Sequence, residues 1–268
     1  MTERTRIGVF DSGVGGLTVL RELVRNVPDA SYLYFGDTAR LPYGSKSAET
    51  VAKYAIEAAH YLEHKGIDLL VVACNTATAL ALPAIRNAVK VPVEGVVEPG
   101  AQAAAAATQR NRVVVIATEA TIRSHAYKIA LEQRKINVCE KACPLFVPLI
   151  EEGWLDHPVT QRVAHVYLDD FFYDYETGPD VLVLGCTHYP LIKSILRSVC
   201  PWRVEIVDSA ECTARVVAKN LGVESAAART TSPEIAYFAT DSVERFRRLG
   251  QLFMGDAIQN VQQVDLGG

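Results

Sequence analysis

Strand-like runs alternate with helix-like stretches along this chain, and that alternation limits the folds open to it. Apolar runs at 7–10, 32–37 and 68–74 are each followed by a turn and then by a segment with the apolar spacing of a helix. This order is typical of parallel sheets that are covered by helices on both faces. Ligands of such sheets bind beyond the carboxyl ends of the strands. We therefore expect an α/β fold whose functional residues follow strand ends.

The pattern restarts after residue 97. The Ala-rich stretch 98–112 reads as a helix and a turn, a new strand follows at 113–117, and Thr118 or Thr121 is expected to cap the next helix. A chain of 268 residues also exceeds the usual size of a single core. We expect a first domain at 1–97, a second at 98–208, and a C-terminal segment at 209–268 that returns to the first domain.

The composition is that of a globular protein without a nucleic-acid footprint. The formal net charge is −4, whereas nucleic-acid binding calls for a basic stripe. The densest basic cluster, 245–248, is expected to be a solvated helix face. The apolar stretch 69–85 is interrupted by polar residues and Pro83, and the N-terminus shows no secretory apolar region. We expect no nucleic-acid partner, no membrane association and a cytoplasmic location.

Six cysteines in such a chain indicate reduced thiols. Cys139 and Cys143 are spaced Cys-x3-Cys without a matching His or Cys pair, so buried structural thiols are expected there rather than a zinc site. We expect no metal and no bound cofactor.

Two strand-like runs end alike, at Cys74 and at Cys186. DLLVVAC (68–74) and DVLVLGC (180–186) each place an Asp six residues before the Cys, and two polar residues follow each Cys. IGVFDSG (7–13) has a weaker echo in VEIVDSA (204–210). Buried parallel strands are all rich in Val and Leu, so coincidence is the alternative. The shared spacing favours a duplication, in which two similar halves face each other across a cleft and present one Cys each.

The residues beside each Cys suit an activated thiol. A helix N-terminus after the Cys favours the thiolate, and Asn75-Thr76 and Thr187-His188 supply hydrogen-bonding groups. His188 can activate the Cys186 thiol or relay its proton. The alternatives are a buried structural Cys and a structural His.

Two turns add candidate ligand-binding groups. The turn from Asp11 to Gly16 follows a strand and opens a helix, and its glycines allow backbone N–H groups to approach a carboxylate. Asp11 is a turn former, an acceptor for a substrate ammonium or an acceptor for a thiol proton. Tyr43-Gly44 either forms an ordinary turn or supplies a hydroxyl and a backbone N–H.

Two facing thiols without a nucleotide loop restrict the chemistry. A Cys–His hydrolase needs one thiol, and a dithiol redox enzyme needs two that can bridge. A reaction that removes a proton from one face of a carbon and returns one to the other needs two acid/base groups, one as thiolate and one as thiol.

Several stretches resemble the cofactor-independent aspartate/glutamate racemase family, in particular the glutamate racemases of bacterial cell-wall synthesis. The matching stretches are FDSGVGGLTVL (10–20), YFGDTARLPYGSKS (34–47), ACNTAT (73–78), PLIEEG (148–153), LGCTHYPLI (184–192) and RFRRLGQLF (245–253). The resemblance implies two similar parallel-sheet α/β domains with the active site in the cleft between them. It also implies interconversion of L- and D-glutamate without a cofactor, which supplies D-glutamate for peptidoglycan synthesis and hence cell shape.

The resemblance assigns roles to residues of this chain. Cys74 and Cys186 are the two acid/base residues, poised by Asp11 and His188 respectively, and Glu151, rather than Glu152, assists on the second side. Thr118 and Thr121 are further candidate ligands. The residues implied to line the substrate site are Asp11, Ser12, Tyr43, Gly44, Asn75, Thr76, Thr187 and His188.

Other functions remain open at this point. A racemase of another acidic amino acid, such as aspartate, would differ in pocket size, which the sequence does not give. A family member that also binds gyrase is an alternative that no sequence feature supports. The resemblance adds a homodimer as an expected assembly, of unspecified geometry.

Overall fold

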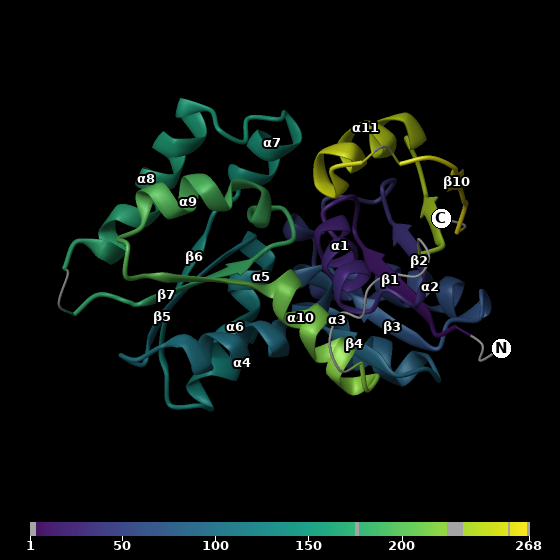
Figure 1. Ribbon diagram of the computed structural model, residues 1–268, viewed down its shortest axis with the longest axis horizontal. Helices are drawn as coiled ribbons and strands as arrows, with labels where there is room; N and C mark the ends of the chain where they lie inside the picture. The colour runs from purple at the N-terminus through teal and green to yellow at the C-terminus, as the bar shows by residue number, and fades with distance from the viewer. Residues whose placement is uncertain (1–3, 175–176, 224–232, 257, 267–268) are drawn as a thin grey trace.

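The computed structural model describes residues 4–174, 177–223, 233–256 and 258–266. Within them the chain forms two parallel sheets, each flanked by helices, which lie side by side as two domains (Figure 1). The expected α/β fold with two parallel-sheet domains is confirmed. Residues 1–3, 175–176, 224–232, 257 and 267–268 of the expected domain ranges lie outside the described residues.

The first sheet has six strands in the order β10-β9-β2-β1-β3-β4. Its strands are β1 (Arg6–Asp11), β2 (Ser31–Gly36), β3 (Leu69–Val72), β4 (Val93–Gly95), β9 (Ile235–Ala239) and β10 (Val261–Gln263). The accompanying helices are α1 (Leu17–Asn26), the 3-10 turn η1 (Tyr43–Ser45), α2 (Ala48–His64), α3 (Asn75–Ala88) and α11 (Val243–Met254). Because β9 pairs with β2 and β10 pairs with β9, the last two strands of the described chain belong to the first sheet.

The second sheet has four strands in the order β6-β5-β7-β8. Its strands are β5 (Arg112–Ala117), β6 (Asn137–Ala142), β7 (Val181–Gly185) and β8 (Glu205–Asp208). The accompanying helices are α4 (Val97–Ala107), α5 (Glu119–Ser124), α6 (Ala126–Glu132), α7 (Phe146–Glu151), α8 (Pro158–Phe172), the 3-10 turn η2 (Tyr189–Ile192) and α9 (Lys193–Val199). Helix α10 (Ser209–Asn220) packs against α1 and α4, so it joins the two domains (Figure 1).

The two sheets share a strand order. The first contains β2-β1-β3-β4 and the second β6-β5-β7-β8, so the two strands that lead into Cys74 and Cys186, β3 and β7, hold the same place. That agrees with the duplication inferred from the spacing. The weaker echo between 7–13 and 204–210 has no counterpart in the topology, because β1 corresponds to β5 and β8 corresponds to β4.

The hydrophobic core explains why the strands are apolar throughout. Alternate residues of a strand point to opposite faces of its sheet, and both faces are buried here. Val71 belongs to a core that also contains Leu182 of the second domain, whereas Val72 packs on the opposite face with α2 and α3. One core is therefore continuous across the two domains and holds them together.

Some local expectations were wrong or incomplete. Thr118 is the N-cap of α5, and Thr121 donates its backbone N–H to it rather than capping the helix itself. The helix expected after 113–117 is interrupted at His125, whose φ of 54° ends α5 before α6 begins. The segment after Cys186 is first a 3-10 turn and only then a helix. Strands β4, β6 and β10 were not anticipated, because they are short or lack a continuous apolar run.

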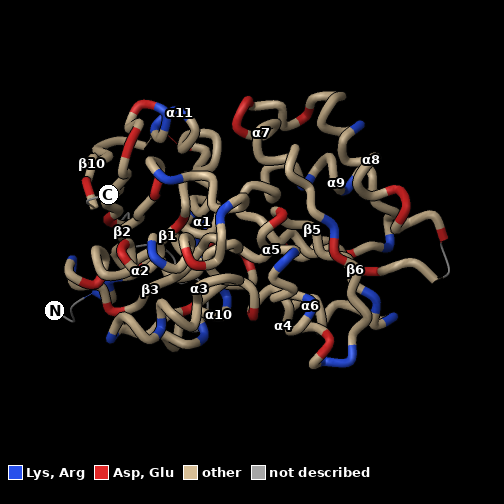
Figure 2. The backbone as a smooth tube through the Cα atoms, turned by 180° about the vertical axis from the view of Figure 1, so that it is seen from behind, with Lys and Arg blue, Asp and Glu red and all other residues tan. Residues whose placement is uncertain are grey.

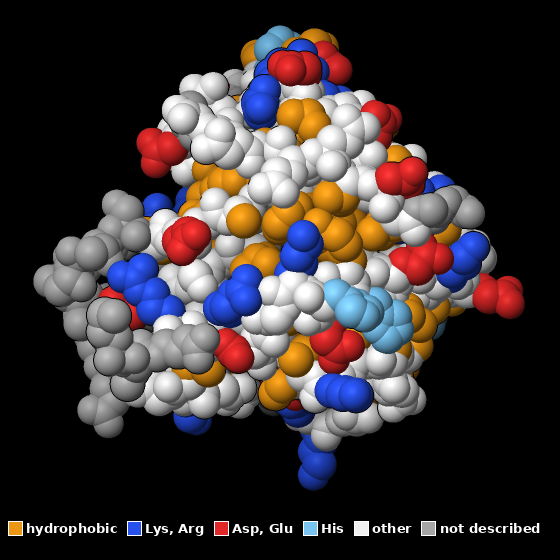
Figure 3. Space-filling model, turned by 90° about the vertical axis from the view of Figure 1, so that its right-hand side faces the viewer, with side chains coloured by type: hydrophobic (Ala, Val, Ile, Leu, Met, Phe, Trp, Pro, Cys, Tyr) orange, Lys and Arg blue, Asp and Glu red, His pale blue; other side chains and the backbone are white. Residues whose placement is uncertain are grey.

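Charges of both signs are interspersed along the backbone of both domains (Figure 2). Figure 3 looks onto the first-domain end of the molecule, where hydrophobic side chains gather near the centre of the face and charged side chains surround them. Among the helices of the described residues, none combines the length and the apolar character needed to cross a membrane.

Candidate active site

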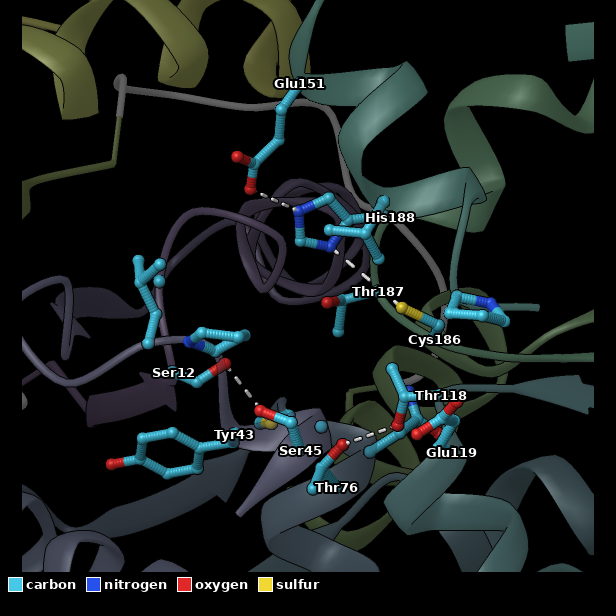
Figure 4. Close-up of a pocket in the computed structure, with 18 of the residues that line it drawn as sticks. Ser12, Tyr43, Ser45, Thr76, Thr118, Glu119, Glu151, Cys186, Thr187 and His188 are labelled. Atoms are coloured by element: carbon cyan, nitrogen blue, oxygen red, sulfur yellow. Dashed lines mark hydrogen bonds and ion pairs between the residues drawn. The ribbon is translucent and has the colours of Figure 1, made fainter. Parts of the chain in front are cut away.

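A pocket of about 380 Å³ lies at the carboxyl ends of strands from both sheets, where ligands of parallel sheets bind. Its volume falls within the roughly 300–1,000 Å³ of small-molecule sites. Eleven of the residues expected at the site line it, and they come from both domains (Figure 4). They are Ser12, Tyr43, Gly44, Cys74, Asn75, Thr76, Thr118, Glu151, Cys186, Thr187 and His188.

Cys74 lies at the N-cap of α3, two residues after the end of β3. Its sulfur accepts a hydrogen bond from the Ala77 backbone N–H at 3.4 Å, and its thiol donates to Ser12 Oγ at 3.6 Å. Burial, followed by the nearby charge of Asp11, raises the pKa of Cys74 to about 12. The helix N-terminus expected beside this Cys is present, but burial outweighs it. Cys74 is therefore a neutral thiol near pH 7.

A histidine lies beside the Cys186 thiol, whereas a helix N-terminus lies beside the Cys74 thiol. The helix expected after Cys186 begins only after the 3-10 turn η2, and His188 Nδ1 lies 4.0 Å from the Cys186 sulfur. On the other side of the ring, His188 Nε2 lies 3.1 Å from Glu151 Oε1. Burial alone would lower the pKa of His188, but its hydrogen bonds to Cys186 and Glu151 outweigh burial and raise it to about 10. A charged imidazole beside a sulfur stabilises the thiolate.

The adjacent glutamates of α7 are clearly distinguished. Glu151 lines the pocket and contacts His188, whereas Glu152 is exposed at the C-terminus of the helix. Burial would raise the pKa of Glu151, but the hydrogen bond from His188 and the charges of His188 and Arg245 lower it instead. Glu151 therefore remains a carboxylate.

Asp11 lies behind the pocket wall rather than in it. It is 1% exposed, and its Oδ2 accepts the backbone N–H of Gly13 at 2.9 Å. Its Oδ1 is buried without a hydrogen-bond partner among the described residues. Burial raises the pKa of this carboxyl group, and its hydrogen bonds oppose that rise only in part. A carboxylate in this state is a stronger base than one in water.

The Tyr43 ring lines the pocket, whereas its hydroxyl is hydrogen-bonded to a buried carboxylate, so a direct role of the hydroxyl in ligand binding stays a prediction. The hydroxyl donates to Asp37 Oδ2 at 2.5 Å and points away from the other pocket residues (Figure 4). Asp37 is fully buried and also accepts from Arg40 Nε. Tyr43 therefore contributes its ring to the pocket wall. Asp37 was not anticipated, although a carboxylate directly after β2 is a signal that could have identified it.

Hydroxyl and amide groups connect the two domains below the thiols. Thr76 Oγ1 lies 2.9 Å from Thr118 Oγ1 and 3.1 Å from Thr121 Oγ1. Tyr127 donates a hydrogen bond to Asn75 Oδ1 at 2.7 Å. The other end of this amide, Asn75 Nδ2, is buried and has no partner among the described residues. Thr118 lines the pocket. No sequence signal marked Tyr127, because it lies within an otherwise ordinary helix.

A close contact between domains sets the position of the second thiol. Thr18 donates to the backbone oxygen of Thr187 at 2.9 Å. A Cβ on Gly15 would lie 2.3 Å from Thr187 Oγ1 and 2.5 Å from His188 Nδ1. The glycine turn expected to approach an anion thus makes room, at Gly15, for the loop that carries Cys186.

The described part of the chain contains no group of three or more His, Cys, Asp and Glu side chains placed to hold a metal ion. All six cysteines are free thiols. Cys143 is buried as expected, whereas Cys139 is exposed, which corrects the expectation that both are buried.

Known proteins share both the sequence and this arrangement. The family model for Asp/Glu/hydantoin racemases matches residues 7–217. The chain belongs to this racemase family. It is 58% identical to the glutamate racemase of Koribacter versatilis, over 99% of both chains. It also resembles the crystal structure of glutamate racemase from Francisella tularensis in complex with D-glutamate, with 34% identity, 98% of both chains covered and a TM-score of 0.88.

A more distant solved structure has a similar fold. The aspartate racemase of Picrophilus torridus is 19% identical, with 81% of this chain and 94% of that chain covered and a TM-score of 0.58. At this identity the likeness shows a shared fold.

Proposed function

We propose that this racemase family member is a glutamate racemase, an isomerase that interconverts L- and D-glutamate and supplies D-glutamate for peptidoglycan synthesis. One observation carries the proposal. Two cysteines at equivalent strand ends of two similar domains line the same pocket. Inversion at one carbon needs an acid/base group on each face of that carbon. The high identity to glutamate racemases supports glutamate as the substrate.

The reaction transfers one proton at each thiol. In the direction from L- to D-glutamate, the Cys186 thiolate takes the α-hydrogen as a proton, and the bonding electrons remain on the α-carbon and its carboxylate. The Cys74 thiol then donates its proton to the opposite face and becomes a thiolate. In the reverse direction the two sulfurs exchange roles. The net result is inversion without any change of oxidation state.

The resting protonation states fit the first of these directions. The pKa of Cys74, raised to about 12 by burial, makes it a proton donor. Positively charged His188, held by Glu151, favours a thiolate at Cys186. In the reverse direction Cys74 must first lose its proton, and the acceptor we infer is the nearby carboxyl group of Asp11, whose pKa is raised by burial.

Polar groups that the chain leaves without partners are available to the substrate. Asn75 Nδ2 is a buried donor without a partner in the described chain and suits a carboxylate oxygen. Ser12 and Thr187 add hydroxyls on the sides of Cys74 and Cys186 respectively. Gly44 also lines the pocket, and its backbone lies beside Thr118.

Three further expectations stay predictions. We expect a homodimer, and the hydrophobic centre of the face in Figure 3 is one surface that a partner could cover. We place the enzyme in the cytoplasm because its six thiols are free. No feature of the described residues argues for gyrase binding as a second role.

The direct test is racemisation by the purified protein. The protein is incubated in EDTA without pyridoxal phosphate, and the loss of optical activity of L-glutamate is followed, with L-aspartate in parallel. We expect racemisation of glutamate under these conditions. Faster racemisation of aspartate would identify the alternative substrate, and a strict need for metal or pyridoxal phosphate would contradict the two-thiol mechanism.

A further inference from the structure

The Glu151 carboxylate is shared between two cationic side chains from different domains. Its Oε1 lies 3.1 Å from His188 Nε2, and its Oε2 lies 2.8 Å from an Arg245 guanidinium nitrogen. Glu151 ends α7 of the second domain, whereas Arg245 is the third residue of α11, which packs on the first domain. Figures 1 and 2 both show α7 and α11 facing each other across the domain boundary.

We propose that Arg245 is a positioning residue that holds the Glu151 carboxylate against His188 and so sets the reactivity of Cys186, but not of Cys74. The inference rests on the proposed function in taking Cys186 as a reacting thiol. It assigns a role to Arg245 of the basic cluster at 245–248, which the sequence indicated only as a solvated helix face.

Helix α11 can position the Glu151 carboxylate because it contacts both His188 and Glu151. Phe246, Leu249 and Phe253 are buried and anchor the helix. The Phe253 ring meets the His188 ring edge-on, with centroids 5.1 Å apart and planes at 86°. Arg245 lies about two turns earlier on the same helix. One rigid element thus fixes both the imidazole ring and the carboxylate that binds it.

The geometry of the carboxylate explains why this ion pair matters beyond stability. An exposed ion pair adds little to folding, and the Arg245 side chain is 53% exposed. Each Glu151 oxygen, however, has its own partner, so the rotation of the carboxylate is fixed. Without Arg245, Oε2 would lose its partner and the group could turn away from His188.

The titratable groups around His188 and Cys186 are consistent with a path of contacts from Arg245 through Glu151 and His188 to Cys186. His188 is faced by Cys186, by Glu151 from α7 and by Asp11 from β1. Cys186 is also close to Cys143, Tyr127 and Tyr189, whose pKa values are all raised, first by burial. Those three stay neutral near pH 7, so His188 and its carboxylate partner dominate the charge beside Cys186.

Turnover alone cannot test the proposal. The two enantiomers of glutamate have equal free energy, so kcat/KM falls by the same factor in both directions whichever thiol is impaired. The alkylation rate of each thiol reports on it separately. Cys74 and Cys186 both line the pocket, and iodoacetamide reacts with the thiolate form.

The experiment compares Arg245→Gln, Arg245→Lys and Arg247→Gln with the wild-type enzyme. Arg247 is the matched control, because it is on the same helix and pairs with Glu244 at 3.5 Å, away from Glu151. Alkylation by iodoacetamide is followed at each cysteine by peptide mass spectrometry as a function of pH. We expect Arg245→Gln to slow Cys186 by about two- to fivefold near pH 7, the range of a half-exposed ion pair. The pH midpoint of Cys186 alkylation should move upward, while the rate of Cys74 alkylation stays unchanged.

Arg245→Lys should restore part of the Cys186 rate, and Arg247→Gln should match the wild type. Equal slowing of both thiols would show that Arg245 only holds the domains together, and faster alkylation of Cys186 would show that Arg245 draws the Glu151 carboxylate away from His188. Either result overturns the proposal. Because alkylation needs no turnover, a wild-type protein that failed to racemise glutamate would refute the proposed function and leave this measurement valid.

Discussion

Cys74 and Cys186 occupy equivalent strand ends, yet the residues around them differ. Cys74 is hydrogen-bonded to Ser12 and to a helix N–H, with a buried carboxyl group nearby. Cys186 is beside a histidine that is itself held by a carboxylate. The two halves of the molecule thus support their thiols by different means. A symmetric reaction does not require symmetric surroundings, only a base and an acid that can exchange roles.

The charge of His188 can be observed directly by NMR. Hydrogen bonds to Cys186 and Glu151 outweigh burial and raise its pKa to about 10, so its ring should titrate far above the usual value of about 6.5. The raised pKa stabilises the folded state fully below pH 6.5, and this contribution is lost as the pH rises through about 10. The signal is assigned by its absence in His188→Asn. Titration near pH 6.5 would contradict the ion pair.

The variant Tyr43→Phe tests whether the Tyr43 hydroxyl stabilises the fold or binds the substrate. The Tyr43 hydroxyl donates to the buried Asp37 carboxylate, and hydrogen bonds to charged groups contribute about 1.5–3 kcal/mol. We expect the free energy of unfolding, measured with urea, to fall by about that amount. The KM for glutamate should stay close to that of the wild type. A large rise in KM with unchanged stability would show that the hydroxyl binds substrate.

At the scale of elements, the sequence predicted the strands and helices that a regular pattern of apolar residues marks. Strands β1, β2, β3, β5 and β7 were found because their apolar runs are buried on both faces. Strand β6 was missed because its residues are only partly buried, and its sequence, NVCEKA, mixes polar and apolar residues. The interruption at His125 depends on one residue with positive φ, which periodicity does not reveal.

The site was predictable to the same extent and for a related reason. Residues just after a strand end, such as Ser12, Cys74 and Cys186, could be placed because strand ends converge at one edge of a sheet. Tyr127 and Arg245 act from helices, through contacts with Asn75 and Glu151. Such contacts depend on how the two domains pack, and no local pattern records that packing.

Gly15→Ala tests the fit between the glycine turn and the Cys186 loop. The added Cβ would lie 2.3 Å from Thr187 Oγ1, so the loop must shift. A misplacement of about 1 Å at a catalytic group can cost about a hundredfold in rate, and we expect kcat/KM to fall by about ten- to a hundredfold.

Gly13→Ala in the same turn is the control. Its Cβ would meet only Leu41, at 3.4 Å, so its loss should be much smaller. Circular dichroism and thermal unfolding check that both variants fold. Equal activity of the two variants would show that the tight contact at Gly15 does not position the second thiol.

At the scale of the whole molecule, the fold brings two similar sheets together so that their Cys-bearing strands end at one pocket. A shared core and helix α10 hold the domains in that relation. The central claim is that each thiol serves one face of the α-carbon. That claim concerns the paired domains, since neither domain alone supplies both groups.

Exchange of the α-hydrogen in heavy water, read by proton NMR with single-Cys variants, tests this claim most directly. Cys74→Ala and Cys186→Ala should each abolish racemisation, because one face loses its acid/base group. The remaining thiolate can still remove and return a proton on its own face. We predict slow exchange of L-glutamate alone by Cys74→Ala and of D-glutamate alone by Cys186→Ala. Exchange of both enantiomers by either variant would show that one base reaches both faces, and the two-thiol account would be wrong.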